Sequence, residues 1–417
     1  MGVTETATHD VIIVGAGLAG LQCARHLQRA GRNVLVLESS DGVGGRVRTD
    51  VVEGFRLDRG FQVLLTAYPE LATEVDLVKL DMRYFDPGAL VRGTSKDHIV
   101  SDPFRDPGHV VPTAFAPIGT VFDKARVGLL RWRVQRSNPR TLLQGEDLST
   151  AEALRKLGFS EKMISRFFAP LVGGIQLDPT LGTSRRMFDI IFRSLSNGDV
   201  GVPKNGMGEL SAQIATHLAP GVVRLHTPVT HVSPTSVTTE SGETLSARCV
   251  VVATEGPVAT RLTGIAPVAS RSVSCVYFAA PTPPTEHKLV VLDGTGSGPV
   301  LNLAVMSNVS ESYAPAGQHL IAAACPAVTQ AGRPNLLDDV RAQLRWWWGP
   351  QVDTWTHLKT YDIAHGQPAQ DPPFPPKKPI SLGEGLFVCG DHRDTGSIQG
   401  AMYSGRRCAV GVLEYLS

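Results

Sequence analysis

The chain has 417 residues, of which 42% are hydrophobic and 19% charged, a composition typical of a soluble globular protein with room for two domains. Lysine and arginine number 40 against 39 aspartates and glutamates, and this balance excludes a bulk attraction to nucleic acid or to anionic membranes. No apolar run approaches the ~20 residues that cross a membrane, and no signal-peptide pattern is visible. We therefore expect a cytoplasmic protein with no stable membrane insertion, and peripheral contact with a membrane stays open.

The six cysteines are scattered along the chain. None belongs to a C-x-x-C pair, and no cysteine–histidine cluster has the spacing of metal ligands, so we predict no metal site. The expected role of all six is that of small buried hydrophobic residues in a reduced protein. They are Cys23, Cys249, Cys275, Cys325, Cys389 and Cys408.

Residues 9–49 contain the first strong motif. The apolar run 11–14 predicts a strand buried on both faces, and residues 15–20 follow it with the pattern G-x-G-x-x-G. Residues 21–30 have helical character and end at a glycine, and residues 34–37 predict a second strand. Strand, glycine turn, helix and strand in this order are typical of a dinucleotide-binding βαβ unit.

Individual residues of this βαβ unit have distinct structural and ligand-binding roles. Gly15 permits the tight turn, Gly17 lets the backbone approach a pyrophosphate, and Gly20 lets the helix pack against the strand. The free N–H groups at the helix start then face the phosphates, where the helix dipole helps. Glu38 stands ~20 residues past the glycines, where a carboxylate can accept both hydroxyls of an adenosine ribose. The alternative is a glycine-rich turn without a ligand.

The next glycines distinguish FAD from NAD. Gly44 and Gly45 allow a second close approach of the backbone, and Arg46 offers a cation for a diphosphate. This segment resembles the second fingerprint of the flavoprotein family that includes monoamine oxidases, protoporphyrinogen oxidases and phytoene desaturases, usually R-x-G-G-R-x-x-S/T. Gly42 or Val43 stands at the position of the family's first arginine. A polar β-hairpin turn is the alternative.

Two later motifs carry the same resemblance. Asp58 and Gly60 match the family's D-x-G, which runs beside the isoalloxazine ring, but Phe61 replaces the small residue that usually follows. Near the end of the chain come a strand, a turn and Asp391, the acid that in the family holds the ribityl or phosphate end of FAD. Residues 396–402 open the last helix, and the resemblance implies that its N-terminus faces the pyrimidine end of the flavin.

The motifs and the resemblance together imply FAD as the cofactor. We expect it to be non-covalent, because no histidine or cysteine lies in a recognised flavin-tethering motif. The residues expected to contact FAD are Gly15, Gly17, Leu18, Ala19, Gly20, Glu38, Ser39, Gly44, Gly45, Arg46, Gly60, Phe61, Gln62, Val229, Thr254, Gly390, Asp391, Ser397, Ile398, Gln399 and Ala401.

Residues 66–204 change character and predict a helical insertion. Helices are expected at 69–77, 122–135, 150–157 and 161–168, and loops at 86–88, 101–119 and 137–145. Residues 124–136 combine basic and apolar positions at helical spacing, and a solvated arginine face over a core stripe is favoured there over a membrane-surface helix. The apolar run 167–175 resembles the desaturase and protoporphyrinogen-oxidase side of the family. That implies a substrate wall near Gly173 and Gly174, with core packing as an equal alternative.

The rest of the chain predicts helices at 210–218 and 336–348 and many short strands. Strands are expected at 222–225, 229–232, 236–239, 243–245, 249–254, 272–278, 289–292, 300–305, 320–324 and 354–360. Monoamine oxidases usually hold a water near flavin N5 with a lysine of the second sheet. Residues 272–278 contain no lysine, and Lys288 is the nearest one. Residues 395–397 provide no aromatic cage.

We therefore predict a two-domain α/β flavoprotein. A discontinuous Rossmann-like FAD domain of the glutathione-reductase type takes residues 1–65, 205–265 and 380–417, and an α+β substrate domain takes 66–204 and 266–379. The predicted function is an FAD-dependent oxidoreductase that moves a hydride from a C–H bond of a hydrophobic small molecule to flavin N5, with oxygen or a quinone as electron acceptor. An amine oxidase and a non-redox isomerase or cyclase are the alternatives. The sequence assigns no catalytic residue and no oligomeric state.

Overall fold

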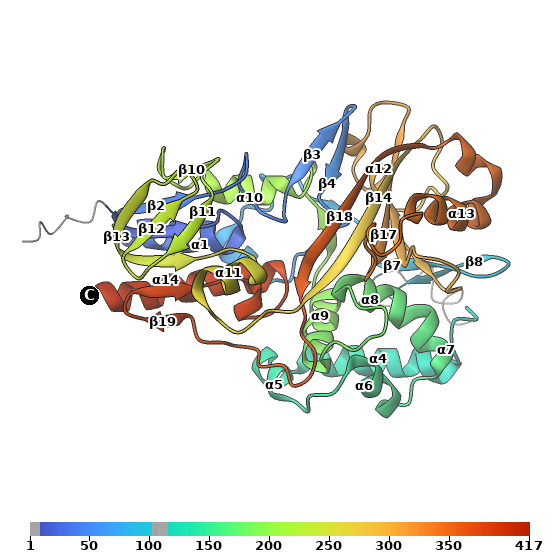
Figure 1. The fold of residues 1–417 in the computed structure, drawn as a ribbon. Helices are drawn as coiled ribbons and strands as arrows, with labels where there is room; N and C mark the ends of the chain where they lie inside the picture. Colours follow the sequence, from blue (N-terminus) through green and yellow to red (C-terminus); the bar gives the residue numbers. More distant parts are fainter. Residues whose placement is uncertain (1–8, 102–104, 106–115) are drawn as a thin grey trace, which may run out of the picture.

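The computed structural model describes residues 9–101, 105 and 116–417. These residues form two large sheets, one at the left of Figure 1 and one at the right, with a layer of helices below the second sheet. This arrangement confirms the predicted α/β fold class. The loop expected at 101–119 lies largely outside the described residues.

The first sheet has the strand order β10-β2-β1-β13-β12-β11, with β20 beside β13 and β19 beside β20. Strands β10, β2, β1, β13 and β20 run parallel. The bounds are β1 (His9–Val14), β2 (Val34–Leu37), β10 (Val223–Arg224), β11 (Val229–Val232), β12 (Ser236–Thr239), β13 (Thr244–Val252), β19 (Ser381–Gly383) and β20 (Leu386–Val388). Because parallel strands end at one edge of a sheet, the residues that follow β1, β2, β13 and β20 come together there.

The apolar runs of the sequence build the centre of this sheet. Residues 11–14 of β1 and 249–252 of β13 are buried, as strands covered on both faces must be. The strands expected separately at 243–245 and 249–254 are one strand, because the residues between them continue the ladder and Ala247 pairs with His9. Helices α1 (Leu18–Arg29) and α14 (Ile398–Leu416) pack on each other beside the sheet (Figure 1).

The second sheet has seven strands in the order β18-β14-β17-β16-β15-β7-β8. Their bounds are β7 (Gly88–Arg92), β8 (Asp97–Ser101), β14 (Ser270–Ala280), β15 (Val290–Asp293), β16 (Asn302–Val305), β17 (His319–Pro326) and β18 (Thr356–Pro368). The expectation that residues 66–204 are purely a helical insertion is therefore wrong, because β7 and β8 extend this sheet. Such short strands carry too few residues for their period to be recognised.

Two small sheets join the halves. A hairpin pairs β3 (Thr49–Val52) with β4 (Phe55–Asp58), and a three-stranded sheet has the order β5-β9-β6. Its strands are β5 (Leu64–Leu65), β6 (Arg83–Tyr84) and β9 (Val200–Val202). Every strand of the first sheet comes from 1–65, 205–265 or 380–417, and every strand of the second from 66–204 or 266–379. The exact domain boundaries stay a prediction, since β5 pairs with β9 across one of them.

The helical layer follows the predicted pattern with three omissions. Its helices are α2 (Pro69–Glu74), α4 (Val121–Arg136), α5 (Pro139–Gln144), α6 (Thr150–Lys156), α7 (Glu161–Met163), a π-helix (Ile164–Phe168), α8 (Ala169–Gln176) and α9 (Arg185–Asn197). A loop was expected at the position of α5, and no helix at the positions of α8 and α9. In α9 the signal was present, because Ser184 caps the helix and Met187, Phe188, Ile191 and Phe192 form its buried face.

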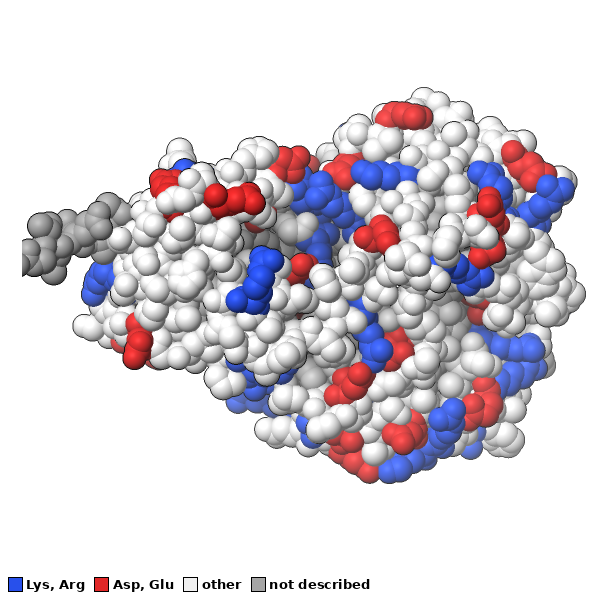
Figure 2. Space-filling model, viewed as in Figure 1, with Lys and Arg blue, Asp and Glu red and all other residues white. Residues whose placement is uncertain are grey.

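Three of the remaining helices are short, namely α10 (Gly208–Ala215), α11 (Gly256–Thr263) and α12 (Met306–Val309). The fourth, α13 (Leu336–Trp348), packs its apolar side on the second sheet. Within the described part of the chain, no helix combines the length and the apolar character needed to cross a membrane. On the face drawn in Figure 2, basic and acidic side chains are interspersed.

Candidate active site

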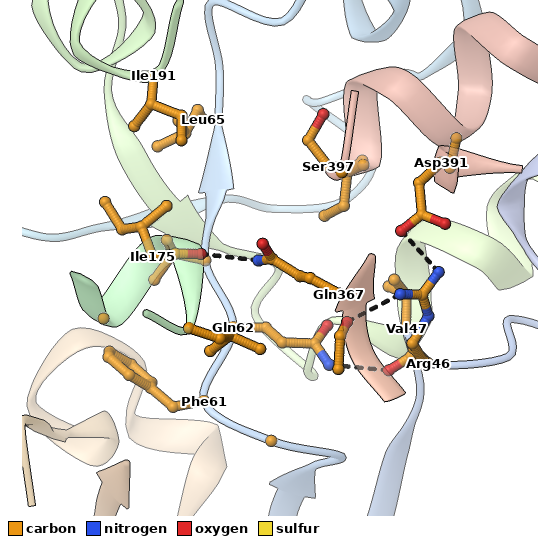
Figure 3. Close-up of a pocket in the computed structure, with 18 of the residues that line it drawn as sticks. Arg46, Val47, Phe61, Gln62, Leu65, Ile175, Ile191, Gln367, Asp391 and Ser397 are labelled. Carbon is orange, nitrogen blue, oxygen red and sulfur yellow. Dashed lines mark hydrogen bonds and ion pairs between the residues drawn. The ribbon is translucent and has the colours of Figure 1, made fainter. Parts of the chain in front are cut away.

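A cavity of about 910 Å³ lies where the carboxyl edge of the first sheet meets the second sheet and the helical layer. One end is lined by the turns that follow β1, β2, β13 and β20, and the other by apolar side chains of the helical layer and the second sheet. Figure 3 shows Arg46 facing Asp391 on one side of this space and Ile175, Leu65 and Ile191 on the other.

The turn between β1 and α1 contains glycines with different tasks. Gly15 has a φ of 105°, and a Cβ there would lie 2.9 Å from the Ala253 carbonyl oxygen. A Cβ on Gly20 would lie 2.0 Å from the Gly15 carbonyl oxygen, so the packing of the turn excludes it. A Cβ on Gly17 would meet no atom within 4 Å. The protein's own packing therefore does not require a glycine at position 17, and a side chain there would project into open space.

Gly17 is also the N-cap of α1, and no side chain accepts a hydrogen bond from the first turn of that helix. A helix start whose N–H groups lack a side-chain cap, beside an uncrowded glycine on a cavity wall, is the geometry that receives a phosphate. This observation shows that the turn fits a dinucleotide cofactor.

Glu38 lies on the cavity wall at the end of β2 and is nearly buried. Its Oε2 accepts a hydrogen bond from the Ala16 N–H at 2.7 Å, and its Oε1 accepts from the Ser40 N–H at 2.9 Å and the Ser40 hydroxyl at 2.8 Å. These bonds hold the carboxylate in place, and Oε2, which accepts only the Ala16 bond among the described residues, keeps a lone pair for a further donor such as a ribose hydroxyl. Ser40 is a residue that the sequence analysis did not single out.

Arg46 and Asp391, predicted from motifs at opposite ends of the chain, form an ion pair of 2.7 Å between Nη2 and Oδ2. A second Arg46 nitrogen donates to the carbonyl oxygen of Gly366 in β18, at 2.8 Å. Burial opposes the charge of the Arg46 guanidinium, but the Asp391 carboxylate outweighs this effect and raises the pKa of Arg46. The motifs predict two separate contacts, whereas in the structure Arg46 and Asp391 form one unit with reduced net charge.

Most residues expected to contact FAD lie on the cavity wall, and their contact with a flavin stays a prediction. Those on the wall are Gly15, Gly17, Leu18, Ala19, Glu38, Ser39, Gly44, Gly45, Arg46, Gly60, Phe61, Gln62, Val229, Thr254, Gly390, Asp391, Ser397, Ile398 and Ala401. Gly20 and Gln399 do not line it. Gly20 packs against Gly15, and the Gln399 Oε1 instead accepts a hydrogen bond from the Glu70 N–H at 2.9 Å, at the start of α2.

Other wall residues were missed by the sequence analysis. Val258 and Leu262, both from α11, give the cavity an apolar surface near Val229. Gly366 and Gln367 come from the end of β18. No local pattern marks them, because they reach the cavity only through the pairing of distant segments.

The far end of the cavity is mainly apolar. The apolar side chains on its wall are Leu65, Ile118, Val127, Met163, Phe167, Leu171, Ile175, Leu177, Ile191, Phe192, Leu195, Val273, Val290, Ala324 and Ile363. Gly174 lies on this wall, and a Cβ there would lie 1.7 Å from the Asn302 Nδ2. Gly173 does not line the cavity and packs against the backbone of Asp178. The substrate wall expected near Gly173 and Gly174 therefore includes only the second of them.

Two glutamine side chains place polar groups at fixed positions in the apolar end of the cavity. The Gln62 Nε2 donates to the carbonyl oxygens of Arg46 and Arg59, at 2.8 and 2.9 Å. The Gln367 Nε2 donates to the Ile175 carbonyl oxygen at 2.7 Å (Figure 3). Backbone carbonyls thus hold both amide nitrogens, and among the described residues no donor is bonded to either Oε1. Each Oε1 is an acceptor that a ligand in the cavity can use.

Two residues considered in the sequence analysis are not part of the wall. Lys288 lies before β15, outside the cavity lining. Asp58 of the D-x-G motif is enclosed by hydrogen bonds from the Thr49 hydroxyl, the Met207 N–H and the Tyr313 hydroxyl, at 2.6, 2.8 and 2.8 Å. It therefore joins segments of the protein, while Gly60 and Phe61 after it reach the wall.

Comparison with known proteins gives a match over nearly the whole chain. The sequence profile of a family described as flavin-containing amine oxidoreductase matches residues 18–413. A putrescine oxidase of Kocuria rosea is 47% identical over 79 residues, which is 19% of this chain and 16% of that protein. A phytoene dehydrogenase of Streptomyces griseus is 54% identical over 54 residues, 13% of this chain and 11% of the relative. The aligned segments thus span well under a fifth of these relatives.

Solved structures share the fold along the chain. A putative protoporphyrinogen oxidase from Exiguobacterium sp. 255-15 superimposes with a TM-score of 0.75 at 18% identity, covering 98% of this chain and 99% of that one. Cyclohexylamine oxidase from Brevibacterium oxydans IH-35A gives a TM-score of 0.69 at 17% identity, with coverage of 98% and 99%. At these identities the likeness concerns the fold alone.

Proposed function

The chain belongs to the flavin-containing amine oxidoreductase family, and we propose that it is an FAD-dependent oxidoreductase which oxidises a hydrophobic small molecule. One observation carries this proposal. A single cavity joins a turn suited to a dinucleotide diphosphate with a mainly apolar chamber, so a cofactor and an apolar substrate can meet in one enclosed space.

The residues of the cradle have distinct parts in holding FAD. The N–H groups at the start of α1, beside Gly17, receive the diphosphate, and Glu38 accepts hydrogen bonds from the ribose hydroxyls. Arg46 and Asp391 present a neutralised pair of donor and acceptor groups to the middle of the cofactor. No cysteine or histidine of the described residues lies on the wall, which supports non-covalent binding. A flavin held there supplies the acceptor for a hydride equivalent from a substrate C–H bond.

The chamber selects the substrate by its apolar wall. Phe61, Ile175 and Ile363 line it, and an ammonium enclosed by these side chains would lose its hydration without compensation, whereas the lining acids Asp86 and Asp199 are exposed. A neutral alicyclic or isoprenoid-like molecule gains contact with the wall at no such cost. We propose oxygen or a quinone as the electron acceptor.

Amine oxidation is the second candidate, and the two glutamines favour it. The Oε1 atoms of Gln62 and Gln367 are fixed acceptors within the chamber. A neutral amine whose N–H groups bond to these oxygens would hold its adjacent C–H bond inside the same space. Loss of hydride from that carbon gives a C=N bond, in place of the C=C bond of a desaturation.

A screen of flavin reduction tests both candidates. The FAD-loaded protein is mixed anaerobically with primary amines, polyprenyl compounds and tetrapyrroles, and bleaching of the flavin absorbance is followed. We expect bleaching by apolar compounds, unchanged in Gln367→Leu. Bleaching by amines alone, lost in Gln367→Leu, would favour amine oxidation. A colourless protein that binds NAD and not FAD would contradict both, and a product of unchanged mass would indicate isomerisation.

A further inference from the structure

Helix α4 carries a cluster of large apolar side chains at the protein surface. Their exposed fractions are 71% for Val121, 74% for Phe122, 64% for Leu129 and 52% for Trp132. Burying such side chains is the normal outcome of folding, so a group of them on one exposed helix is typical of a contact surface. We call these four residues the α4 apolar face.

The α4 apolar face occupies one side of the helix. Phe122, Leu129 and Trp132 are spaced by seven and three residues, which places them on the same side of an α-helix. The side that packs on the protein includes Asp123, Leu130 and Val134, and Val127 is partly buried against the same core. The expected apolar core stripe is therefore present, and the exposed apolar residues are a second apolar side of α4 that the sequence did not predict.

Basic residues are frequent on this helix, although Arg133 pairs with Asp189 at 2.6 Å and the Lys124 ammonium donates to the Ala116 carbonyl oxygen at 2.8 Å. Helix α4 contains five cations and one acid, Asp123, whose carboxylate is buried and accepts hydrogen bonds from Thr120 and Ser160. The Arg136 guanidinium lies over the Trp132 ring, 4.7 Å from its centroid. An apolar stripe bordered by arginines is the surface of a helix that lies in the interface of an anionic bilayer, where arginines reach the headgroups.

The same helix forms a wall of the cavity. Lys124, Val127, Gly128 and Arg131 line the cavity on the side of α4 next to the apolar face. A Cβ on Gly128 would meet no atom within 4 Å. The lining also includes Asp86 and Gly88, which are exposed. One helix thus carries the α4 apolar face and part of the cavity wall.

We propose that α4 docks on a bilayer containing anionic phospholipid. Phe122, Leu129 and Trp132 enter the boundary between headgroups and acyl chains, and the exposed Arg136, beside Trp132, pairs with a phosphate. Because α4 also forms part of the cavity wall, an apolar substrate can pass from the lipid to the chamber along this helix; this delivery step rests on the proposed function. The overall charge balance of the chain does not oppose docking, because the attraction is local to one helix.

Flotation of the FAD-loaded full-length protein with vesicles tests the proposal. We expect binding to vesicles of phosphatidylcholine mixed with phosphatidylglycerol, and much weaker binding to phosphatidylcholine alone or at high salt. The triple variant F122S/L129S/W132S should lower the bound fraction at least about tenfold, because three buried apolar anchors are lost. Trp346→Ser is the matched control, since Trp346 is also 52% exposed but lies on α13. It should bind like the parent.

The outcomes distinguish membrane docking from self-association and from loss of folding. Flavin absorbance of the triple variant reports on folding and on the FAD site, so a failure of the proposed function is visible independently of flotation. Equal binding by the triple variant, or no binding of the parent to anionic vesicles, would overturn the proposal. Sedimentation that shows a dimer, split by the same three substitutions, would instead assign the α4 apolar face to a second copy of the chain.

Discussion

The acids in the sequence motifs have different tasks. Glu38 faces the cavity and is held by the Ala16 N–H and by Ser40. Asp58 is enclosed, and burial raises its pKa to about 6 although the hydroxyls of Thr49 and Tyr313 stabilise the carboxylate. The first acid is therefore available to a ligand, whereas the second carries a cost to folding that depends on pH.

Replacing Glu38 by alanine should weaken FAD binding. The lost bonds to ribose hydroxyls are charge-assisted and contribute about 1.5–3 kcal/mol each at most, so we expect an affinity at least about tenfold lower. Titration of the apoprotein with FAD measures this, and Glu240→Ala, an exposed acid outside the cavity lining, serves as the control. An unchanged dissociation constant would mean that Glu38 does not contact the ribose.

Replacing Asp58 by asparagine should reveal the pH-dependent free-energy cost of burying the ionised Asp58 carboxylate. The folded-state pKa of about 6 lies above the unfolded value of 3.8, so the stability that Asp58 contributes below the unfolded pKa is lost as pH rises through the folded one. Two pKa units correspond to about 3 kcal/mol. The asparagine side chain can accept hydrogen bonds from Thr49 and Met207 and donate one to Tyr313. The unfolding free energy of the variant minus that of the parent should therefore increase as the pH rises from about 4 to about 6. Urea unfolding across this range measures the difference, and a constant difference would contradict the prediction.

The strands and helices around the first sheet were largely predictable from local sequence patterns, and the turns between them line the cavity. The turn from β1 into α1 combines glycines required by packing, Gly15 and Gly20, with one that packing does not require, Gly17. At the start of α14 a Cβ on Gly400 would lie 1.8 Å from the Thr395 carbonyl oxygen. That glycine shapes the turn before the helix, and it acts on the cavity only through the turn.

Alanine substitutions of Gly17 and Gly20 should have different effects, one mainly on FAD affinity and the other mainly on the unfolding free energy. Gly17→Ala places a methyl group in the cavity, so FAD affinity should fall while the unfolding free energy changes by about 0.5 kcal/mol or less. Gly20→Ala forces a contact at 2.0 Å with the Gly15 carbonyl oxygen and should lower the unfolding free energy by about 1–3 kcal/mol, typical of overpacking. FAD titration and urea unfolding of both variants measure this. Equal effects of the two substitutions on affinity would contradict the assignment.

Across the whole molecule, interleaved segments build two sheets that enclose one cavity. Arg46 connects them, because it pairs with Asp391 after β20 and donates to the Gly366 carbonyl oxygen in β18. A ligand in the cavity touches both halves and therefore binds the folded chain but not the unfolded one.

FAD should stabilise the complete fold by mass action. At free FAD about 100 times its dissociation constant, the unfolding free energy should rise by about 2.7 kcal/mol. Thermal unfolding of the apoprotein with increasing FAD measures this as a rising midpoint, and AMP at the same concentration should have a smaller effect because it reaches only the adenosine end. An unchanged midpoint would contradict binding of FAD in this cavity.

The sequence by itself determined the features that depend on neighbouring residues. The strand, glycine turn and helix at 11–30, the acid at Glu38 and the strand before Asp391 are local patterns, and the family they predict is confirmed by the match over residues 18–413. Helix α13 was predicted at its observed bounds, because an amphipathic segment of 13 residues repeats its period often enough to be recognised.

Only the tertiary structure decided what depends on distant segments. The pair Arg46–Asp391 and the meeting of Gln62 with Gln367 arise because strands far apart in sequence end beside one cavity. The orientation of α4 also depends on the tertiary structure. Periodicity shows that a helix has an apolar side, but whether that side is buried or exposed depends on what packs against it, and no local pattern contains that information.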